Sequence, residues 1–227
     1  MPFLKSWDQV FAMALLPIIL PLLAILYVVV VPLQGRPFFF ASERMRNTEE
    51  AFLLLKLRTM KPLGSEGVET VSGGAEAHRI TPVGEFLRKS RLDELPQIFN
   101  VLKGDIRFIG PRPPLRRYVE AMPKLYEDVL GDTPPGITGL ATVMLHGWEE
   151  RLMSECQSDW EALEVYYRRC LPLKARLDRI YRDNQSMSLN LLILWRTFSR
   201  LDVPLPKTLP SLARVISILR LRPTQAA

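Results

Sequence analysis

The feature that most constrains this chain is an uncharged apolar run over residues 10–33, close to the N-terminus. About 20 apolar residues in a helix are enough to cross the hydrocarbon core of a bilayer. No small-residue site of the kind that ends a cleaved signal peptide follows the run. We therefore expect residues 1–34 to form a membrane-inserted unit that stays attached to the rest of the chain.

Pro17 and Pro21 lie inside this run. Proline lacks a backbone N–H donor and clashes with the carbonyl four residues earlier, so we expect the helix to bend or break there. The residues alone leave two topologies open: a kinked helix that spans the bilayer, and a re-entrant helix that returns to the face from which it entered. Basic residues that follow the run, such as Arg36 and Arg44, place the downstream side in the cytoplasm.

Chain length and net charge limit the number of domains and the kinds of binding partner that the protein can have. A chain of 227 residues suits one domain with a real core. A formal charge of +6 suits an anionic partner such as a phospholipid surface, a nucleotide or a nucleic acid. We expect no nucleic-acid partner, because no binding module is recognisable and such a role leaves the apolar N-terminus unexplained. Cys156 and Cys170 do not form a CxxC pair, so no zinc site is predicted.

The remaining pattern predicts an α/β (α+β) fold that is mostly helical, with a catalytic domain at residues 35–201 and an amphipathic tail at 202–227. The tail suits either an anionic membrane surface or packing on the domain. Thr81 and Pro82 form a helix start, with threonine as N-cap and proline at the first helical position. Alternation and helical spacing give the following expected elements: a strand at 51–60, a loop at 62–74, helices at 83–90, 92–102 and 116–130, a turn-rich connection at 134–139, and helices at 149–183, kinked near Pro172, and 189–201.

Two adjacent carboxylates, Asp93 and Glu94, lie among basic residues. On a helix they point about 100° apart, so they do not share a proton as a facing pair would. One can face a substrate while the other binds a metal, and Mg²⁺ prefers a few carboxylate oxygens together with phosphate oxygens. A carboxylate that attacks phosphorus forms an acyl phosphate, which is a known covalent route. Considered alone, such a pair is more often a solvated ion-pair surface.

Cationic side chains around the pair suit phosphate, because the planar guanidinium group of arginine donates two parallel hydrogen bonds to it. Lys56 and Arg58 are two residues apart on the expected strand and would project from one face of it. The candidate phosphate-binding residues are Lys56, Arg58, Arg88, Arg91 and Arg112.

Several linked motifs resemble those of the bacterial sugar transferases called monotopic phosphoglycosyl transferases. The central ones are residues 92–97 (Leu-Asp-Glu-Leu-Pro-Gln), 100–105 (Asn-Val-Leu-Lys-Gly-Asp) and 110–113 (Gly-Pro-Arg-Pro). The resemblance covers roughly residues 8–197, in order and without large gaps, and the chain is similar to the minimal form of the family. Further matches lie at 35–40, 56–60, 135–141 and 181–194.

The resemblance implies a re-entrant membrane helix broken at Pro21, with both ends cytoplasmic, and interfacial amphipathic helices. It implies that Asp93 attacks the β-phosphate of a UDP-sugar, releases UMP and passes the sugar phosphate to polyprenol (undecaprenyl) phosphate, which starts glycan or exopolysaccharide assembly. Glu94 would bind Mg²⁺. The implied location is the cytoplasmic face of the bacterial inner membrane, among membrane lipids. The oligomeric state stays open, with a homodimer as one option.

The chain also departs from the family pattern. Leu20 stands where the family has serine before the proline, and the other departures are Ser42, Arg46, Thr142 and Asn190. The alternative interpretation is a catalytically inactive membrane-bound family member that acts as a partner protein in polysaccharide assembly. Loss of Asp93, Glu94 or the arginines would mark that case, and all are present. The sequence predicts neither the sugar, nor the polyprenol length, nor the pathway.

Overall fold

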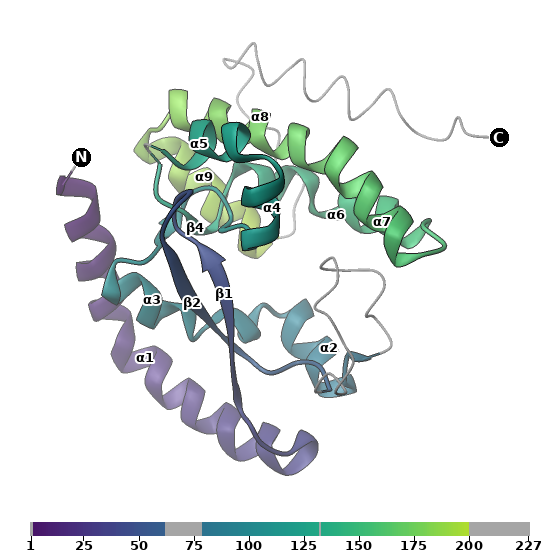
Figure 1. Ribbon diagram of the computed structural model, residues 1–227. Coiled ribbons are helices and arrows are strands. Elements are labelled where there is room, and N and C mark those ends of the chain that lie inside the picture. The colour runs from purple at the N-terminus through teal and green to yellow at the C-terminus, as the bar shows by residue number, and fades with distance from the viewer. Residues whose placement is uncertain (1, 62–78, 132, 200–227) are drawn as a thin grey trace.

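The computed structural model describes residues 2–61, 79–131 and 133–199. Helices outnumber strands, as the sequence predicted, and one long helix lies at the edge of the molecule (Figure 1). In chain order the elements are α1 (Pro2–Gln34), β1 (Phe39–Met45), β2 (Ala51–Leu57), α2 (Pro82–Lys89), a 3₁₀ turn (Leu92–Glu94), α3 (Gln97–Lys103), β3 (Arg107–Ile109), α4 (Arg116–Ala121), α5 (Pro123–Leu130), β4 (Gly136–Thr138), α6 (Leu140–Ser154), α7 (Asp159–Val165), a π turn (Tyr166–Cys170), α8 (Leu171–Asp183) and α9 (Met187–Ser199).

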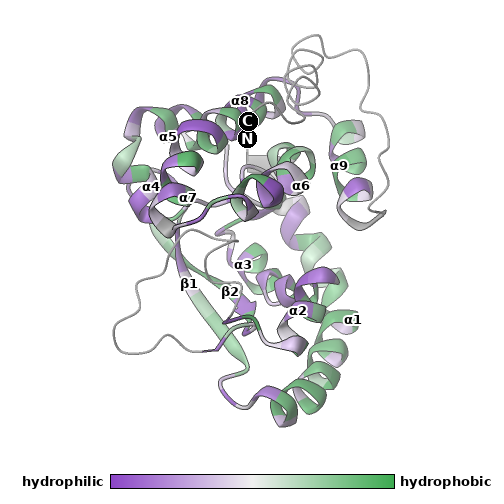
Figure 2. Ribbon diagram, turned by 90° about the vertical axis from the view of Figure 1, so that its right-hand side faces the viewer, coloured by the Kyte–Doolittle hydropathy of each residue, from purple (hydrophilic) through white to green (hydrophobic). Residues whose placement is uncertain are grey.

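Helix α1 contains Pro17, Pro21 and Pro32, yet it runs without a break to Gln34. The break predicted at Pro21 is therefore absent, and the helix instead follows a curved course along the molecule (Figure 1). Gly35, with φ of 74°, ends the helix. The stretch Trp7–Gln34 is long and apolar enough to cross a membrane by length and composition. Figure 2 shows α1 green along most of its length.

One face of α1 packs on the rest of the protein. Ala12, Leu23 and Val30 are buried against side chains from β2, α2 and α3. The helix also presents apolar side chains outward, and Ile18 and Val28 are 67% and 70% exposed. Burial of apolar residues on one face and their exposure on another is expected of a helix that contacts a protein domain and lipid at the same time.

Polar contacts fix both ends of α1 to the same domain. Near the N-terminus, the Asp8 carboxylate accepts a hydrogen bond from the backbone N–H of Phe108 (3.2 Å), and Gln9 Nε2 donates to the Leu102 carbonyl (3.0 Å). At the other end, Gln34 Nε2 donates to the carbonyl of Arg58 (2.6 Å). The two ends of the helix therefore both lie at the surface of one folded unit.

Strands β1 and β2 form an antiparallel hairpin, with pairs from Phe39↔Leu57 to Met45↔Ala51. The outer edge of β2 is hydrogen-bonded to Asn100 of α3, which is 1% exposed. Asn100 Oδ1 accepts from the Leu55 N–H (3.0 Å), and its Nδ2 donates to the Leu53 carbonyl (2.8 Å). Because a lone hairpin is marginally stable, these bonds help to fix β2 to α3.

Strands β3 and β4 are parallel, with Arg107 opposite Gly136 and Ile109 opposite Thr138. Both strands end in glycine-containing turns that approach closely. A Cβ at Gly139 would lie 2.1 Å from the carbonyl oxygen of Gly110, so only glycine fits there. The turn-rich connection predicted at 134–139 therefore contains a strand, and it supports the turn at residues 110–113.

Several helices begin or end at other residues than the sequence predicted. The helix predicted at 116–130 is broken at Met122, where Pro123 starts α5. The region predicted at 149–183 begins earlier, at Leu140, and is interrupted between Ser154 and Asp159. A π turn lies just before Pro172, near the expected kink. The predicted loop at 62–74 and the tail at 202–227 lie outside the described residues.

Candidate active site

The two carboxylates lie on a tight turn between α2 and α3. Helix α2 starts as predicted, with Thr81 Oγ1 accepting a hydrogen bond from the Gly84 N–H (2.9 Å). It ends before Arg91, which has a positive φ of 57° and so starts the 3₁₀ turn Leu92–Glu94. The prediction that Asp93 and Glu94 belong to one α-helix at 92–102 was wrong in this respect. Neighbouring residues on a 3₁₀ turn also diverge, by about 120°, so the two carboxylates still face different directions.

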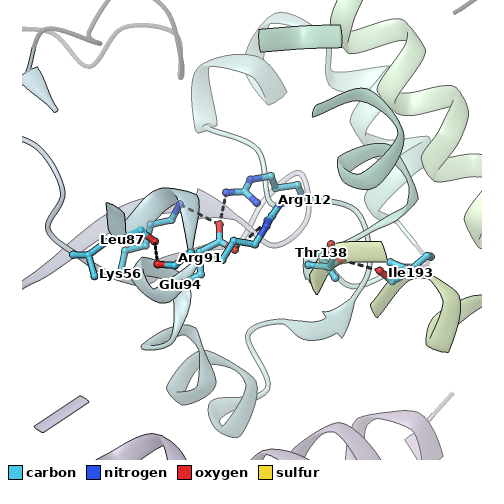
Figure 3. A network of polar contacts seen from close by, with 9 residues as sticks. Lys56, Leu87, Arg91, Glu94, Arg112, Thr138 and Ile193 are labelled. Atoms are coloured by element: carbon cyan, nitrogen blue, oxygen red, sulfur yellow. Dashed lines mark hydrogen bonds and ion pairs between the residues drawn. The ribbon is translucent and has the colours of Figure 1, made fainter. Parts of the chain in front are cut away.

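Glu94 is surrounded by cations from three parts of the chain (Figure 3). Its carboxylate lies 2.8 Å from Arg112 Nη2, 3.6 Å from Arg91 Nη1 and 3.8 Å from Lys56 Nζ. Burial alone would raise the pKa of Glu94, but Arg112, Lys56 and Arg91 outweigh it and hold the pKa at about 2. Glu94 is therefore ionised at neutral pH and neutralises part of a strongly positive cluster.

Asp93 is in a different environment, although it is the next residue. Its side chain is buried, and this burial raises its pKa, with the negative charge of Glu94 adding to the effect. The charges of Lys56, Arg88 and Arg112 act in the opposite direction and favour the carboxylate. A buried carboxylate of raised pKa is more basic and less solvated than a surface one, which suits a nucleophile.

Lys56 has a lowered pKa of about 8, because burial disfavours its ammonium form and Arg112 repels it, while Glu94 and Asp93 act in the opposite sense. It comes from β2, which packs beside the 3₁₀ turn. The hairpin, the 3₁₀ turn and the turn at 110–113 thus each contribute charge to one site. Such an arrangement can bind an anion and place it against Asp93.

The structure brings most of the predicted phosphate-binding residues together. Arg88 Nε donates to Thr59 Oγ1 (2.9 Å) and its charge acts on Asp93. Arg58 lies elsewhere: its guanidinium group donates to the carbonyls of Gln34 and Gly35 at the end of α1. Strand β2 ends at Leu57, so the expectation that Lys56 and Arg58 share a strand face does not extend to Arg58.

A second charged pair beside Arg112 was not predicted. Lys174 Nζ lies 2.6 Å from Glu149 Oε2 and 3.2 Å from the Tyr166 hydroxyl. The charge of Glu149 also raises the pKa of Arg112, to which Glu94 contributes most. Sequence reasoning missed the pair because its members lie on α6 and α8, 25 residues apart, and no local spacing connects them.

The site suits a magnesium ion only if phosphate oxygens of a bound ligand complete the coordination shell. Within the described residues, no group of three or more His, Cys, Asp or Glu side chains could hold a metal ion. Mg²⁺ commonly takes one or two protein carboxylates and completes its shell with water and substrate phosphate oxygens. Glu94 and Asp93 would supply one or two carboxylate oxygens to such an ion, and a bound phosphate ligand would supply others.

The long apolar helix is typical of a membrane-associated protein, and the cation-rich carboxylate site suits an anionic ligand. A family model described as bacterial sugar transferase matches residues 2–202, and the chain belongs to this family.

Named relatives show the same likeness. The chain is 30% identical over 199 residues to the UDP-N-acetylgalactosamine-undecaprenyl-phosphate N-acetylgalactosaminephosphotransferase of Aeromonas hydrophila, a match that covers 85% of this chain and 42% of that protein. It is 34% identical over 146 residues to the UDP-glucose:undecaprenyl-phosphate glucose-1-phosphate transferase of Escherichia coli, covering 63% and 31%. It is 41% identical over 109 residues to a putative undecaprenyl-phosphate N-acetylgalactosaminyl 1-phosphate transferase of Bacillus subtilis, covering 48% and 60%. The chain therefore spans less than two thirds of the length of these relatives.

Proposed function

We propose that this protein transfers a sugar 1-phosphate from a UDP-sugar to undecaprenyl phosphate, releases UMP and thereby starts the assembly of a bacterial glycan or exopolysaccharide. The observation that carries the proposal is the pairing of a buried Asp93 with an ionised Glu94 inside a cation cluster. The names of the relatives supply the donor and acceptor classes. The sugar differs among those relatives, so it stays open here.

The reaction proceeds in two displacements at one phosphorus atom. A carboxylate oxygen of Asp93 attacks the β-phosphorus, the bond from that phosphorus to the bridging oxygen breaks, and UMP leaves with the electron pair. An oxygen of the acceptor phosphate then attacks the aspartyl phosphate, and the Asp93 carboxylate leaves. A phosphate monoester has a second pKa of about 6. The attacking oxygen is thus largely deprotonated at neutral pH without a catalytic base.

The cations make the first displacement feasible. A carboxylate and a diphosphate repel each other, and Lys56, Arg88 and Arg112 reduce this repulsion around Asp93. Mg²⁺ held by Glu94 and the diphosphate would neutralise phosphate charge that develops on the leaving group. Arg58 takes no part in this scheme, because its guanidinium group is engaged at the end of α1.

We also propose that α1 is re-entrant, with its bend in the region of Pro21 and the catalytic domain on the cytoplasmic face of the inner membrane. A helix that spans the bilayer carries its two ends to opposite sides. Asp8, Gln9 and Gln34 instead bind the same domain, which supports a helix that returns to its side of origin. Helix α9 adds an apolar surface of interfacial type, because Met187, Leu191 and Trp195 are exposed at helical spacing.

Side-specific labelling tests this topology. In a variant without Cys156 and Cys170, a cysteine in place of Ser6 is expected to react with a membrane-impermeant maleimide only in inside-out vesicles. A matched cysteine in place of the exposed Gln157 is expected to react from the same side, because Gln157 belongs to the catalytic domain. Reaction of the two cysteines from opposite sides would show a spanning helix and contradict the proposal.

Release of UMP from a panel of UDP-sugars tests the function itself. With purified protein, Mg²⁺ and undecaprenyl phosphate, we expect continuous release of UMP from the correct donor. Without the acceptor, release is expected to stop at about one UMP per enzyme molecule, because the sugar phosphate stays on Asp93. Absence of UMP with every donor named by the relatives would contradict the proposal and favour an inactive partner protein.

A further inference from the structure

Exposed aromatic side chains lie where the hairpin leaves the end of α1. Phe39 and Phe40, at the start of β1, are 47% and 43% exposed. The rings of Tyr27 and Phe38 lie 5.2 Å apart, and those of Phe38 and Phe39 lie 4.8 Å apart, both edge to face. Phe38 is buried, at 5% exposed, and packs between the other two rings; we call the exposed Tyr27, Phe39 and Phe40 the aromatic strip. It continues the outward apolar surface of α1, on which Val28 is 70% exposed.

The aromatic strip ends at the candidate active site. Phe40 pairs with Lys56 across the hairpin. Directly opposite residues in an antiparallel pair point to the same face, with their Cβ atoms about 5 Å apart. Lys56 in turn contacts Glu94, next to Asp93. Phe39 points to the other face of the hairpin, the face of Leu57, which packs on α1. The exposed rings therefore pass over the first residues of β1, from the side of the membrane helix to a cation beside the candidate nucleophile.

We propose that the aromatic strip binds the isoprenoid chain of the polyprenol phosphate acceptor and delivers its phosphate to Lys56. This inference rests on the proposed function. The acceptor is complementary to this surface. Its apolar chain matches the aromatic side chains, and its terminal phosphate carries the charge opposite to that of Lys56. The chain could then stay in contact with apolar groups from the bilayer to the site, so little of it would be exposed to water.

The arrangement also explains why exposed rings occur in this part of the hairpin. A soluble domain gains nothing from two adjacent exposed phenylalanines, and such patches usually mark a ligand or membrane contact. The strip spans the end of α1 and the start of β1, and Phe40 lies across the hairpin from Lys56. Figure 1 shows the hairpin leaving the end of α1. A lipid chain on the strip is therefore close both to the hydrocarbon and to the reacting phosphorus.

The test separates the two displacements. The variant Phe40→Thr removes the ring and keeps a residue that favours strands. We expect its KM for undecaprenyl phosphate to rise about tenfold, because the ring area no longer covers the chain. The single UMP released without acceptor should be unchanged. The matched control is Leu53→Thr, which removes another exposed apolar side chain from the same hairpin, 61% exposed, and should change neither quantity.

A short acceptor gives a second readout. Geranyl phosphate has too little chain to occupy the whole strip, so its KM should differ less between the wild type and Phe40→Thr than that of undecaprenyl phosphate. An unchanged KM for undecaprenyl phosphate in the variant would overturn the inference. If Phe40→Thr lost acceptor-free UMP release as much as acceptor-dependent turnover, Phe40 would belong to the donor site and the inference would be overturned. If the variant no longer sedimented with vesicles, the strip would be a membrane anchor only. Absence of UMP from the wild type would instead refute the proposed function.

Discussion

The variant Asp93→Asn is expected to lose turnover by a factor on the order of 10⁴ or more, because an amide does not attack phosphorus and nothing replaces the covalent step. It should also lose the single UMP released without acceptor, which separates a nucleophile from a residue that assists only the second displacement. The measurement is UMP formation with the donor identified for the wild type, over a time long enough to detect a slow residual rate.

An asparagine side chain has nearly the volume of the aspartate that it replaces, so the variant should fold and stay bound to membranes. Burial raises the pKa of Asp93, which means that removal of its charge relieves a desolvation cost, and the melting temperature should not fall greatly. Asp183→Asn, at an exposed carboxylate paired with Arg182, is the matched control and should retain full activity. Wild-type activity in Asp93→Asn would refute its role as the nucleophile.

Glu94→Gln is expected to have the second largest effect, with turnover lower by a factor on the order of 100 or more. The variant loses the carboxylate proposed to hold Mg²⁺, so the rate should respond much less to added Mg²⁺ than that of the wild type. It also leaves Lys56, Arg91 and Arg112 without their shared anion. The melting temperature should therefore fall by several degrees, unlike that of Asp93→Asn.

Glu43→Gln is the matched control for this variant, because Glu43 also contacts an arginine, Arg116, at 2.8 Å but lies on the surface. An exposed pair contributes little to stability, so we expect this control to keep both activity and melting temperature. Should chelation of Mg²⁺ leave the wild type fully active, or should Glu94→Gln keep the wild-type response to Mg²⁺, the metal role of Glu94 would be refuted.

Local signals predicted much of this structure. The uncharged run at 10–33 gave the long apolar helix, and Thr81 with Pro82 gave the start of α2 within a residue. The charged residues of the site were also found from the sequence, since Lys56, Arg91 and Arg112 do surround Glu94. These predictions were possible because each depends either on residues that are neighbours in the sequence or on motifs that follow one another in a fixed order.

Features that depend on long-range contacts were missed. β4 has three residues and exists because Gly136 lets it approach Gly110. Arg58 shares a sequence motif with Lys56, but the end of β2 and the carbonyls of α1 decide where its side chain goes. The contact between Glu149 and Lys174 requires two helices to pack, which no periodicity of either helix reveals.

Asn100 has a consequence beyond its place in the hairpin. An unpaired strand edge can recruit a strand from another molecule, and proteins confined to a membrane surface meet one another at high local concentration. The amide of Asn100 satisfies the carbonyl of Leu53 and the N–H of Leu55, the groups to which an incoming strand would bond. A residue of the helix that follows the candidate nucleophile thus protects the neighbouring strand against intermolecular sheet growth and aggregation.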